Sequence, residues 1–386
     1  MVRIPDQEYK ERAVRVQAEM ERRKLDLLLA YSCECESANV RYLADFKPCF
    51  DFAGVLVPCQ GEPALITGGP ESIVYAQAYS RIKKILIHPF FLETSAPDYS
   101  ETKNIRFSDI IPEVVDGLEI KKVGIAGSNI MPIAIYRDLE RALPGREIVE
   151  ADDILFKIRM IKSDNELKVL ERAYKITEAA MRAAIDYTDA GKSEWEIEAK
   201  AQCVMRSMGA EDTSYPVWVC SGSNTNQGLS KSSSRKIRKG ELVQLSIGSK
   251  YEGYCGNMCR ALVVGKIPKD VRRLMEVDLE AEETILDAMQ PGAEASRLYS
   301  LYVDILKKHG FEKPSLYGPA HGTGTQECEG PWIDSASTFT LKPGMVFNVD
   351  IWLSEGNLGM RIEDGIAITG KRGKQLSSYM REAISK

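Results

Sequence analysis

The stretch Gly240–Lys266, GELVQLSIGSKYEGYCGNMCRALVVGK, contains two apolar runs, 242–245 and 261–264, on either side of a short polar connection. Apolar runs of this length, bounded by glycine, predict two β-strands. Gly253 and Gly256 interrupt the pattern where a strand must bend or where another group comes close. The stretch therefore predicts a β-hairpin.

One face of the second predicted strand is chemically unusual. Side chains alternate between the two faces of a strand, so Cys255, Asn257 and Cys259 share one face. Two thiols and an amide form an odd wall for an apolar core. We therefore expect this face to line a site.

The hairpin resembles that of the creatinase / aminopeptidase P / prolidase family, whose catalytic domain has the pita-bread fold. In the metallopeptidases of this family, the hairpin reads roughly L-I-D-x-G…G-Y-x-S-D-x-T-R, and its two aspartates begin a dinuclear metal site. These positions fall on Ser246 and Asn257 here, so both metal-binding carboxylates are missing.

Composition limits the class of protein. The chain has 386 residues, a net charge of −5 and nine cysteines. The negative charge disfavours a nucleic-acid partner, and no apolar run is long enough to span a membrane. The first residues, MVRIPDQEYKERA, carry no apolar signal core, so we expect a cytoplasmic protein with reduced thiols.

Strands and helices alternate in the first part of the chain, which indicates an α/β domain. The predicted helices are 7–24 and 131–142, and the predicted strands are 26–31, 53–58, 63–67, 84–88 and 121–125. Ser163 and Glu166 form a capping box that opens a helix running to about Tyr187. With the resemblance, these patterns predict an α/β N-terminal domain over residues 1–155 and an α+β pita-bread domain over residues 156–386.

A weak internal repeat supports this fold. Two glycines, Gly191 and Gly209, bracket one predicted helix, and Gly292 and Gly310 bracket another at the same spacing. Each helix follows a longer helix and leads into a predicted sheet region. The resemblance implies such an internal pseudo-twofold.

The resemblance implies three further metal-ligand positions. The histidine of G-H-x-x-G falls on His321, and the motif R-I-E-D places another ligand at Glu363. The glutamate that follows P-G-M-V-F is replaced by Asp350. A family histidine further along the loop is replaced by Cys328, and Glu329 matches the family glutamate there.

With both aspartates gone, the charge of a dinuclear site is not matched. A single metal on His321, Asp350 and Glu363 remains one interpretation, with help from a thiolate of Cys255 or Cys259. The alternative for Asp350 and Glu363 is a buried polar network around Arg361.

Creatinase is the metal-free enzyme of the family, and its motifs therefore bear on this chain. The creatinase histidine falls on Leu229, and a creatinase glutamate falls on Cys259. The run that holds the substrate carboxylate falls on Phe50 and Asp51, with no arginine. We expect Asp51 to favour a cationic or zwitterionic ligand, unless Lys47 pairs with it. The resemblance also implies a homodimer in which this run lies near the partner's site.

The thiols admit two interpretations. Cys259 near His321 could act as a nucleophile, with Glu363 orienting the imidazole. The alternative is that small apolar cysteines simply pack well in a buried strand.

The leading interpretation is a metal-independent hydrolase of a C–N bond in a small amino-acid-like or amidine-bearing molecule, without a cofactor. His321 would be the acid/base group, oriented by Glu363 and Asp350. The residues expected beside the substrate are Asn257, Cys255, Cys328, Glu329, Arg361, Phe50 and Asp51. One alternative is a divergent Xaa-Pro peptidase with at most one metal, and another is a non-catalytic binding protein on the same fold.

Overall fold

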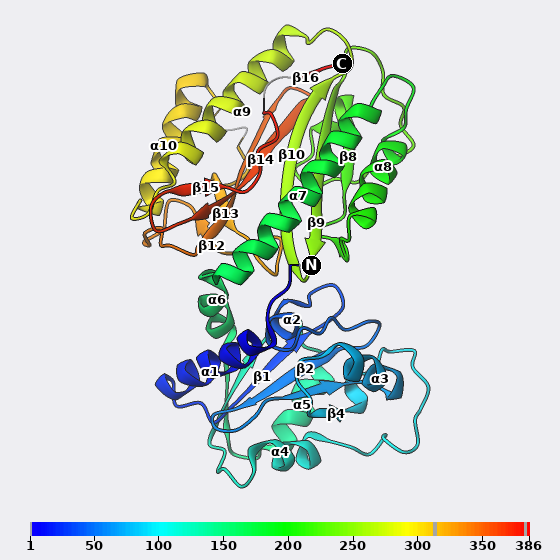
Figure 1. Ribbon diagram of the computed structural model, residues 1–386, viewed down its shortest axis with the longest axis vertical. Coiled ribbons are helices and arrows are strands. Elements are labelled where there is room, and N and C mark those ends of the chain that lie inside the picture. Colours follow the sequence, from blue (N-terminus) through cyan, green and yellow to red (C-terminus); the bar gives the residue numbers. More distant parts are fainter. Residues whose placement is uncertain (1, 312–314, 382–383) are drawn as a thin grey trace. The chain divides into compact units, whose positions relative to one another are not determined.

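The computed structural model describes residues 2–311, 315–381 and 384–386 (Figure 1). The chain forms two compact units. One is Ile4–Arg159, and the other is Met160–Lys386 together with Val2 and Arg3. Within the described ranges, no helix is both long and apolar enough to cross a bilayer.

The N-terminal domain is a mixed six-stranded sheet in the order β4-β3-β2-β1-β5-β6. Its strands are β1 (Leu27–Ser32), β2 (Ala53–Pro58), β3 (Ala64–Thr67), β4 (Ile85–Ile87), β5 (Lys122–Ala126) and β6 (Glu147–Glu150). Its helices are α1 (Asp6–Arg22), α2 (Ala38–Ala44), η1 (Pro89–Phe91), α3 (Pro70–Tyr79), α4 (Phe107–Val115), α5 (Ile133–Ala142) and α6 (Asp152–Met160). The five predicted strands are confirmed, whereas β6 has no counterpart among them.

Successive side chains of β1 point to opposite faces of the sheet, which explains the two apolar layers of this domain. Leu28 and Ala30 belong to a core that includes Val16 and Met20 of α1. Leu27, Leu29 and Tyr31 point to the other face, into a core that includes Phe107 and Ile110 of α4. A strand that is buried on both faces reads as the continuous apolar run seen in the sequence.

The C-terminal domain contains a ten-stranded sheet whose main path is β12-β11-β13-β14-β10-β9-β7. Its strands are β7 (Asp212–Thr213), β8 (Trp218–Ser221), β9 (Leu242–Tyr251), β10 (Tyr254–Val263), β11 (Ala320–Gly322), β12 (Glu329–Ile333), β13 (Val346–Glu355), β14 (Leu358–Ile368), β15 (Gly373–Gln375) and β16 (Ile384–Ser385). Its helices are α7 (Asp164–Tyr187), α8 (Glu194–Ser207), η2 (Gly222–Thr225), α9 (Lys269–Ala288) and α10 (Ala295–His309). The predicted hairpin is confirmed as β9 and β10.

Helix α7 begins as the sequence predicts. The Ser163 hydroxyl accepts a hydrogen bond from the Glu166 backbone N–H (3.1 Å), and Glu166 accepts one from the Ser163 N–H (2.8 Å). This capping box satisfies two backbone donors that the first helical turn leaves without partners. The helix ends at Tyr187, as expected.

The two halves of the C-terminal domain repeat one pattern of helices, hairpin and backbone hydrogen bonds. The long helix α7 packs on β9 and β10, and α9 packs on β13 and β14 (Figure 1). The matching backbone hydrogen bonds are Gly191 N to Ile237 O and Gly292 N to Leu341 O, then Gly240 N to Val264 O and Gly344 N to Ile368 O. The predicted internal repeat is therefore present in the backbone, although its side chains differ.

Tyr174 of α7 occupies the space where the two hairpins diverge. Strands β10 and β14 pair only at Cys259 and Glu363. A Cβ on Gly256 would lie 2.6 Å from Tyr174 N, and one on Gly365 would lie 2.1 Å from Tyr174 Cζ. Both positions need glycine because the tyrosine backbone and ring fill the space that a side chain would take. This contact also places Gly256 on the α7 face of β10, so Cys255, Asn257 and Cys259 point to the opposite face, as predicted.

Candidate active site

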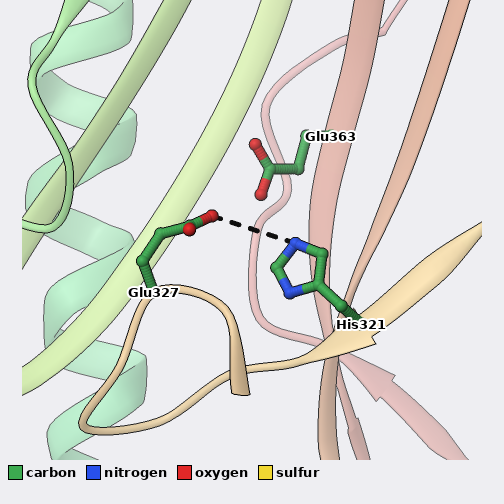
Figure 2. Close-up of side chains that lie close together, drawn as sticks. All are labelled: His321, Glu327 and Glu363. Carbon is green, nitrogen blue, oxygen red and sulfur yellow. Dashed lines mark ion pairs between the residues drawn. The ribbon is translucent and has the colours of Figure 1, made fainter. Parts of the chain in front are cut away.

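Three side chains from different elements converge on this opposite face. His321 lies on β11, Glu327 on the loop that follows it, and Glu363 on β14 (Figure 2). Their possible ligand atoms all lie within 4.8 Å of one another. The histidine and Glu363 are buried, whereas the Glu327 side chain is 31% exposed. The cluster can therefore be reached from solvent on the side of Glu327.

The orientation of His321 is fixed by its backbone neighbour. His321 Nδ1 lies 2.9 Å from the carbonyl oxygen of Gly322, which can only accept, so Nδ1 carries the proton. The other nitrogen, Nε2, lies 3.8 Å from Glu327 Oε1 (Figure 2). The imidazole ring also packs on Trp332, with ring centroids 5.1 Å apart. Nε2 is therefore the atom that His321 presents to the site.

Glu363 has one engaged and one unengaged oxygen. The Cys259 thiol donates to Oε2 at 3.1 Å, and Oε1 is buried with no hydrogen-bond partner among the described residues. Burial raises the pKa of Glu363 well above its usual range, and the negative charges of Asp350 and Glu327 raise it further. A buried carboxylate oxygen without a partner is expensive, so this atom favours a proton or a cation.

Glu327 is the site residue that the sequence analysis missed. Burial raises its pKa, while nearby His321 acts to lower it. The Asn257 amide nitrogen lies 3.4 Å from Glu327 Oε1, and the amide oxygen accepts from the Ser214 hydroxyl at 2.6 Å. Asn257 thus holds the acid in place. The only signal in the sequence was the pair of glutamates flanking Cys328.

Asp350 takes part in a different interaction from the predicted one. Its Oδ1 lies 3.0 Å from Arg361 Nε, and both side chains are buried. The Arg361 Nη2 donates to the Tyr317 hydroxyl (2.5 Å) and to the Gly228 carbonyl oxygen (2.9 Å). The guanidinium holds this carboxylate, so the predicted orientation of His321 by Asp350 has no support in these contacts and stays a prediction. The contacts of Asp350 agree with the alternative interpretation, a buried polar network around Arg361.

The thiols are hydrogen-bonding or packing groups here. Burial, followed by the charge of Glu363, raises the pKa of Cys259 well above its usual range, so the thiol keeps its proton. Its sulfur lies 3.3 Å from Ser246 Oγ and 3.1 Å from Glu363. Cys259 is therefore a donor to Glu363, which agrees with the packing alternative, and the role of a nucleophile stays an untested prediction. Burial also raises the pKa of Cys255 to about 12 and that of Cys328 above its usual value.

Glu329 has a structural partner in place of the expected substrate. Lys162 Nζ donates to Glu329 Oε1 at 2.8 Å, and both side chains are almost fully buried. This ion pair joins the segment before α7 to the start of β12. The expected contact of Glu329 with a substrate has no support in this ion pair and stays a prediction.

The Asp51 carboxylate forms hydrogen bonds within the N-terminal domain. It accepts hydrogen bonds from Ser72 Oγ (2.5 Å), Gly69 N (3.2 Å) and Glu93 N (3.0 Å). These donors satisfy the buried carboxylate without a cationic ligand, which corrects the expected selection of cations by Asp51. Phe50 beside it is 72% exposed.

The other two histidines are paired away from this cluster. His88 Nε2 lies 2.9 Å from Asp138 Oδ2, and His309 Nε2 lies 2.9 Å from Glu280 Oε2. Since His88 Nδ1 accepts from the Phe90 N–H, His88 donates to Asp138. The choice of His321 as the histidine of the site is consistent with this geometry.

Comparisons with known proteins place this arrangement in a family. Residues 168–370 match metallopeptidase family M24, and residues 12–161 match the creatinase/prolidase N-terminal domain. An Xaa-Pro dipeptidase of Pyrococcus horikoshii is 30% identical over 266 residues, which cover 69% of this chain and 75% of the relative. The chain therefore belongs to metallopeptidase family M24.

Solved structures support the same fold. The prolidase from Pyrococcus horikoshii matches with a TM-score of 0.84 and 25% identity, over 97% of this chain and 100% of that one. The prolidase from Thermococcus sibiricus matches with a TM-score of 0.84 and 26% identity, over 98% and 99% of the two chains. These relatives do not support the leading interpretation of metal independence, and they fit its dipeptidase alternative better.

The residues present do not fit two metal ions but do fit one. Of the five implied positions, Ser246 and Asn257 have no carboxylate, and Asp350 is held by Arg361. His321 and Glu363 remain, and Glu327 lies beside them. Glu327 therefore supplies a carboxylate in place of the one that is missing at position 257. One nitrogen and two carboxylates form a usual donor set for a divalent ion with an open position.

Proposed function

We propose that this chain hydrolyses the C–N bond of a small Xaa-Pro-type dipeptide with a single divalent metal ion held by His321, Glu327 and Glu363. The observation that carries the proposal is the convergence of these ligand atoms within 4.8 Å around the unpartnered Glu363 Oε1. Membership of the family and the named dipeptidase relative support the substrate class.

A divalent ion bound there would supply Lewis acidity toward the scissile carbonyl and would lower the pKa of water. The protein groups prepare this site before an ion arrives. The Gly322 carbonyl fixes the proton on His321 Nδ1, so Nε2 is free to act as a ligand. The Cys259 thiol engages Glu363 Oε2, which leaves Oε1 directed to the site.

The charge of Arg361 affects the pKa values of the acids in the site. Its positive charge acts to lower the pKa of both Glu327 and Glu363, against the larger effect of burial. Asp350 holds the guanidinium at 3.0 Å, so the charge is fixed in position. Arg361 therefore favours the ionised carboxylates that metal binding requires.

The test uses the purified protein after removal of metal with a chelator. We expect hydrolysis of Ala-Pro to depend on added Mn²⁺ or Zn²⁺. We expect Glu327→Gln to reduce kcat/KM on the order of 100-fold, since loss of metal-site groups commonly costs this much. The matched control is Glu355→Gln, a change at an exposed acid at the end of β13.

Two outcomes would contradict the proposal. Hydrolysis that persists undiminished in the presence of chelator would indicate a metal-independent hydrolase. Metal binding without turnover of Ala-Pro, Gly-Pro or longer Xaa-Pro peptides would indicate a binding protein on the same fold. A homodimer stays a prediction from the family resemblance, and light scattering at micromolar concentration tests it.

A further inference from the structure

The loop that follows β1 holds two thiols against each other. Cys33 Sγ and Cys35 Sγ lie 3.5 Å apart and share a hydrogen bond. The loop is closed by a hydrogen bond from Cys33 N to the Glu36 carbonyl oxygen at 3.2 Å. Since a disulfide is about 2.05 Å long, the two sulfurs need to approach by only about 1.5 Å to form one.

The two thiols differ in accessibility. Cys35 is exposed, whereas Cys33 is half-buried. Burial and the hydrogen bond shared with Cys35 raise the pKa of Cys33. The thiolate is the attacking species in thiol–disulfide exchange, and access to the reagent also controls its rate. Cys35 is therefore the thiol that a small reagent meets first, and Cys33 is placed behind it.

We propose that Cys33 and Cys35 form a reversible thiol–disulfide exchange site for low-molecular-weight disulfides. The Cys35 thiolate attacks one sulfur of the small disulfide RSSR, whose S–S bond breaks and releases RS⁻. The Cys33 sulfur then attacks the Cys35 sulfur and displaces the second RS⁻. The two cysteine protons end on the two released thiols, so the pair loses two electrons and RSSR gains two.

The position of Glu34 gives this exchange a structural consequence. Glu34 lies between the two cysteines, and its carboxylate accepts a hydrogen bond from the Phe50 backbone N–H at 3.4 Å. Phe50 is 72% exposed and has a φ of 62°, a region that bulky residues rarely adopt. Drawing the sulfurs together turns the backbone that carries Glu34. We therefore expect oxidation to change the surroundings of Phe50.

The experiment treats the reduced full-length protein with oxidised glutathione and then alkylates the remaining thiols. We expect mass spectrometry to find the peptide with Cys33 and Cys35 lighter by two hydrogens and alkylated at neither cysteine. Cys203, an exposed thiol on α8, serves as the internal control and should carry glutathione or the alkyl group. Reduced glutathione in excess should restore alkylation of the pair.

Two variants test the assigned roles. Cys33→Ser should trap the mixed disulfide of glutathione on Cys35, and Cys35→Ser should leave Cys33 largely unmodified. Cys203→Ser should leave formation of the internal disulfide unchanged. The proposal is overturned if wild-type Cys33 and Cys35 each carry glutathione as Cys203 does, or if both stay fully alkylatable.

Discussion

The two hairpins of the C-terminal domain share one backbone pattern and carry different side chains toward the site. In β9 and β10, Ser246 pairs in register with Cys259. In β13 and β14, Asp350 pairs in register with Glu363. The backbone hydrogen bonds at the base of each hairpin are the same, from Gly240 to Val264 and from Gly344 to Ile368. The fold thus depends on backbone pairing and on apolar faces, and it leaves the side chains directed to the site free to differ.

The difference also shows how charge is balanced in the site. The first hairpin presents a hydroxyl, a thiol and the Asn257 amide. The carboxylate on this side comes from Glu327 on a neighbouring loop, which Asn257 contacts. The second hairpin carries two carboxylates of its own, and Arg361 neutralises one of them. One acid from each side then remains for a cation, which is the physical basis for the single ion that we propose.

The largest expected effect comes from breaking the ion pair of the second hairpin. Asp350→Asn leaves the buried Arg361 charge without its partner, which should lower the free energy of unfolding by about 3–5 kcal/mol. Urea denaturation measures the loss. The control is Ser246→Ala at the matching position of the first hairpin, which removes no charge and should cost about 1 kcal/mol or less. Similar losses in the two variants would show that the hairpins are energetically equivalent.

The next prediction distinguishes the contribution of Glu363 to metal affinity from that of Cys259, its partner in the strand register. Glu363→Gln removes a proposed ligand, so we expect metal affinity to fall on the order of 100-fold. Cys259→Ser keeps a hydrogen-bond donor beside Glu363 and should change the affinity by less than about tenfold. Calorimetric titration with Mn²⁺ measures both. If Cys259→Ser weakens binding as much as Glu363→Gln, the thiol is itself a ligand.

The last effect concerns the helices behind the hairpins and depends on pH. Helix α9 carries Asp278 and Glu282, both fully buried, and burial raises the pKa of each carboxyl well above its usual range. At pH values above the usual carboxyl pKa, these two groups are ionised in the unfolded chain while they still hold their protons in the folded protein. Stability should therefore fall as pH rises toward the folded pKa values, by at most about 1.4 kcal/mol per pH unit per group.

The double change Asp278→Asn and Glu282→Gln removes this titration. We expect the urea midpoint of the variant to depend less steeply on pH than that of the wild type between pH 5 and pH 8. Tyr174→Phe on α7, the helix behind the first hairpin, is the control, because burial raises the pKa of Tyr174 well above this range. An unchanged slope in the double variant would show that the two carboxyls are already ionised in the folded protein.

Much of the fold could be read from the sequence because its signals are local. The hairpin, the Ser163 capping box and the bracketing glycines depend on residues close together in the chain. Glu363 could be found because its motif R-I-E-D is intact, and His321 because the histidine and the loop glycines of its motif are kept. Each lies on a strand of the sheet, so its position follows from the register of the backbone.

The remaining features depend on contacts that no local pattern encodes. Glu327 reaches the site because a loop turns back toward Asn257 on another strand. The partner of Asp350 depends on its pairing with β14, which directs Arg361 alongside it. Likewise, three donors distant in sequence satisfy Asp51. Residue identity alone could not distinguish a ligand from a structural acid in these cases.

The stoichiometry of bound metal tests the central claim most directly. Elemental analysis after saturation with Mn²⁺ or Zn²⁺ and removal of free ions should give one ion per chain. That ion should be lost in Glu327→Gln and in His321→Gln and retained in the control Glu355→Gln. Two tightly held ions per chain, or one ion that Glu327→Gln retains in full, would contradict a single site on His321, Glu327 and Glu363.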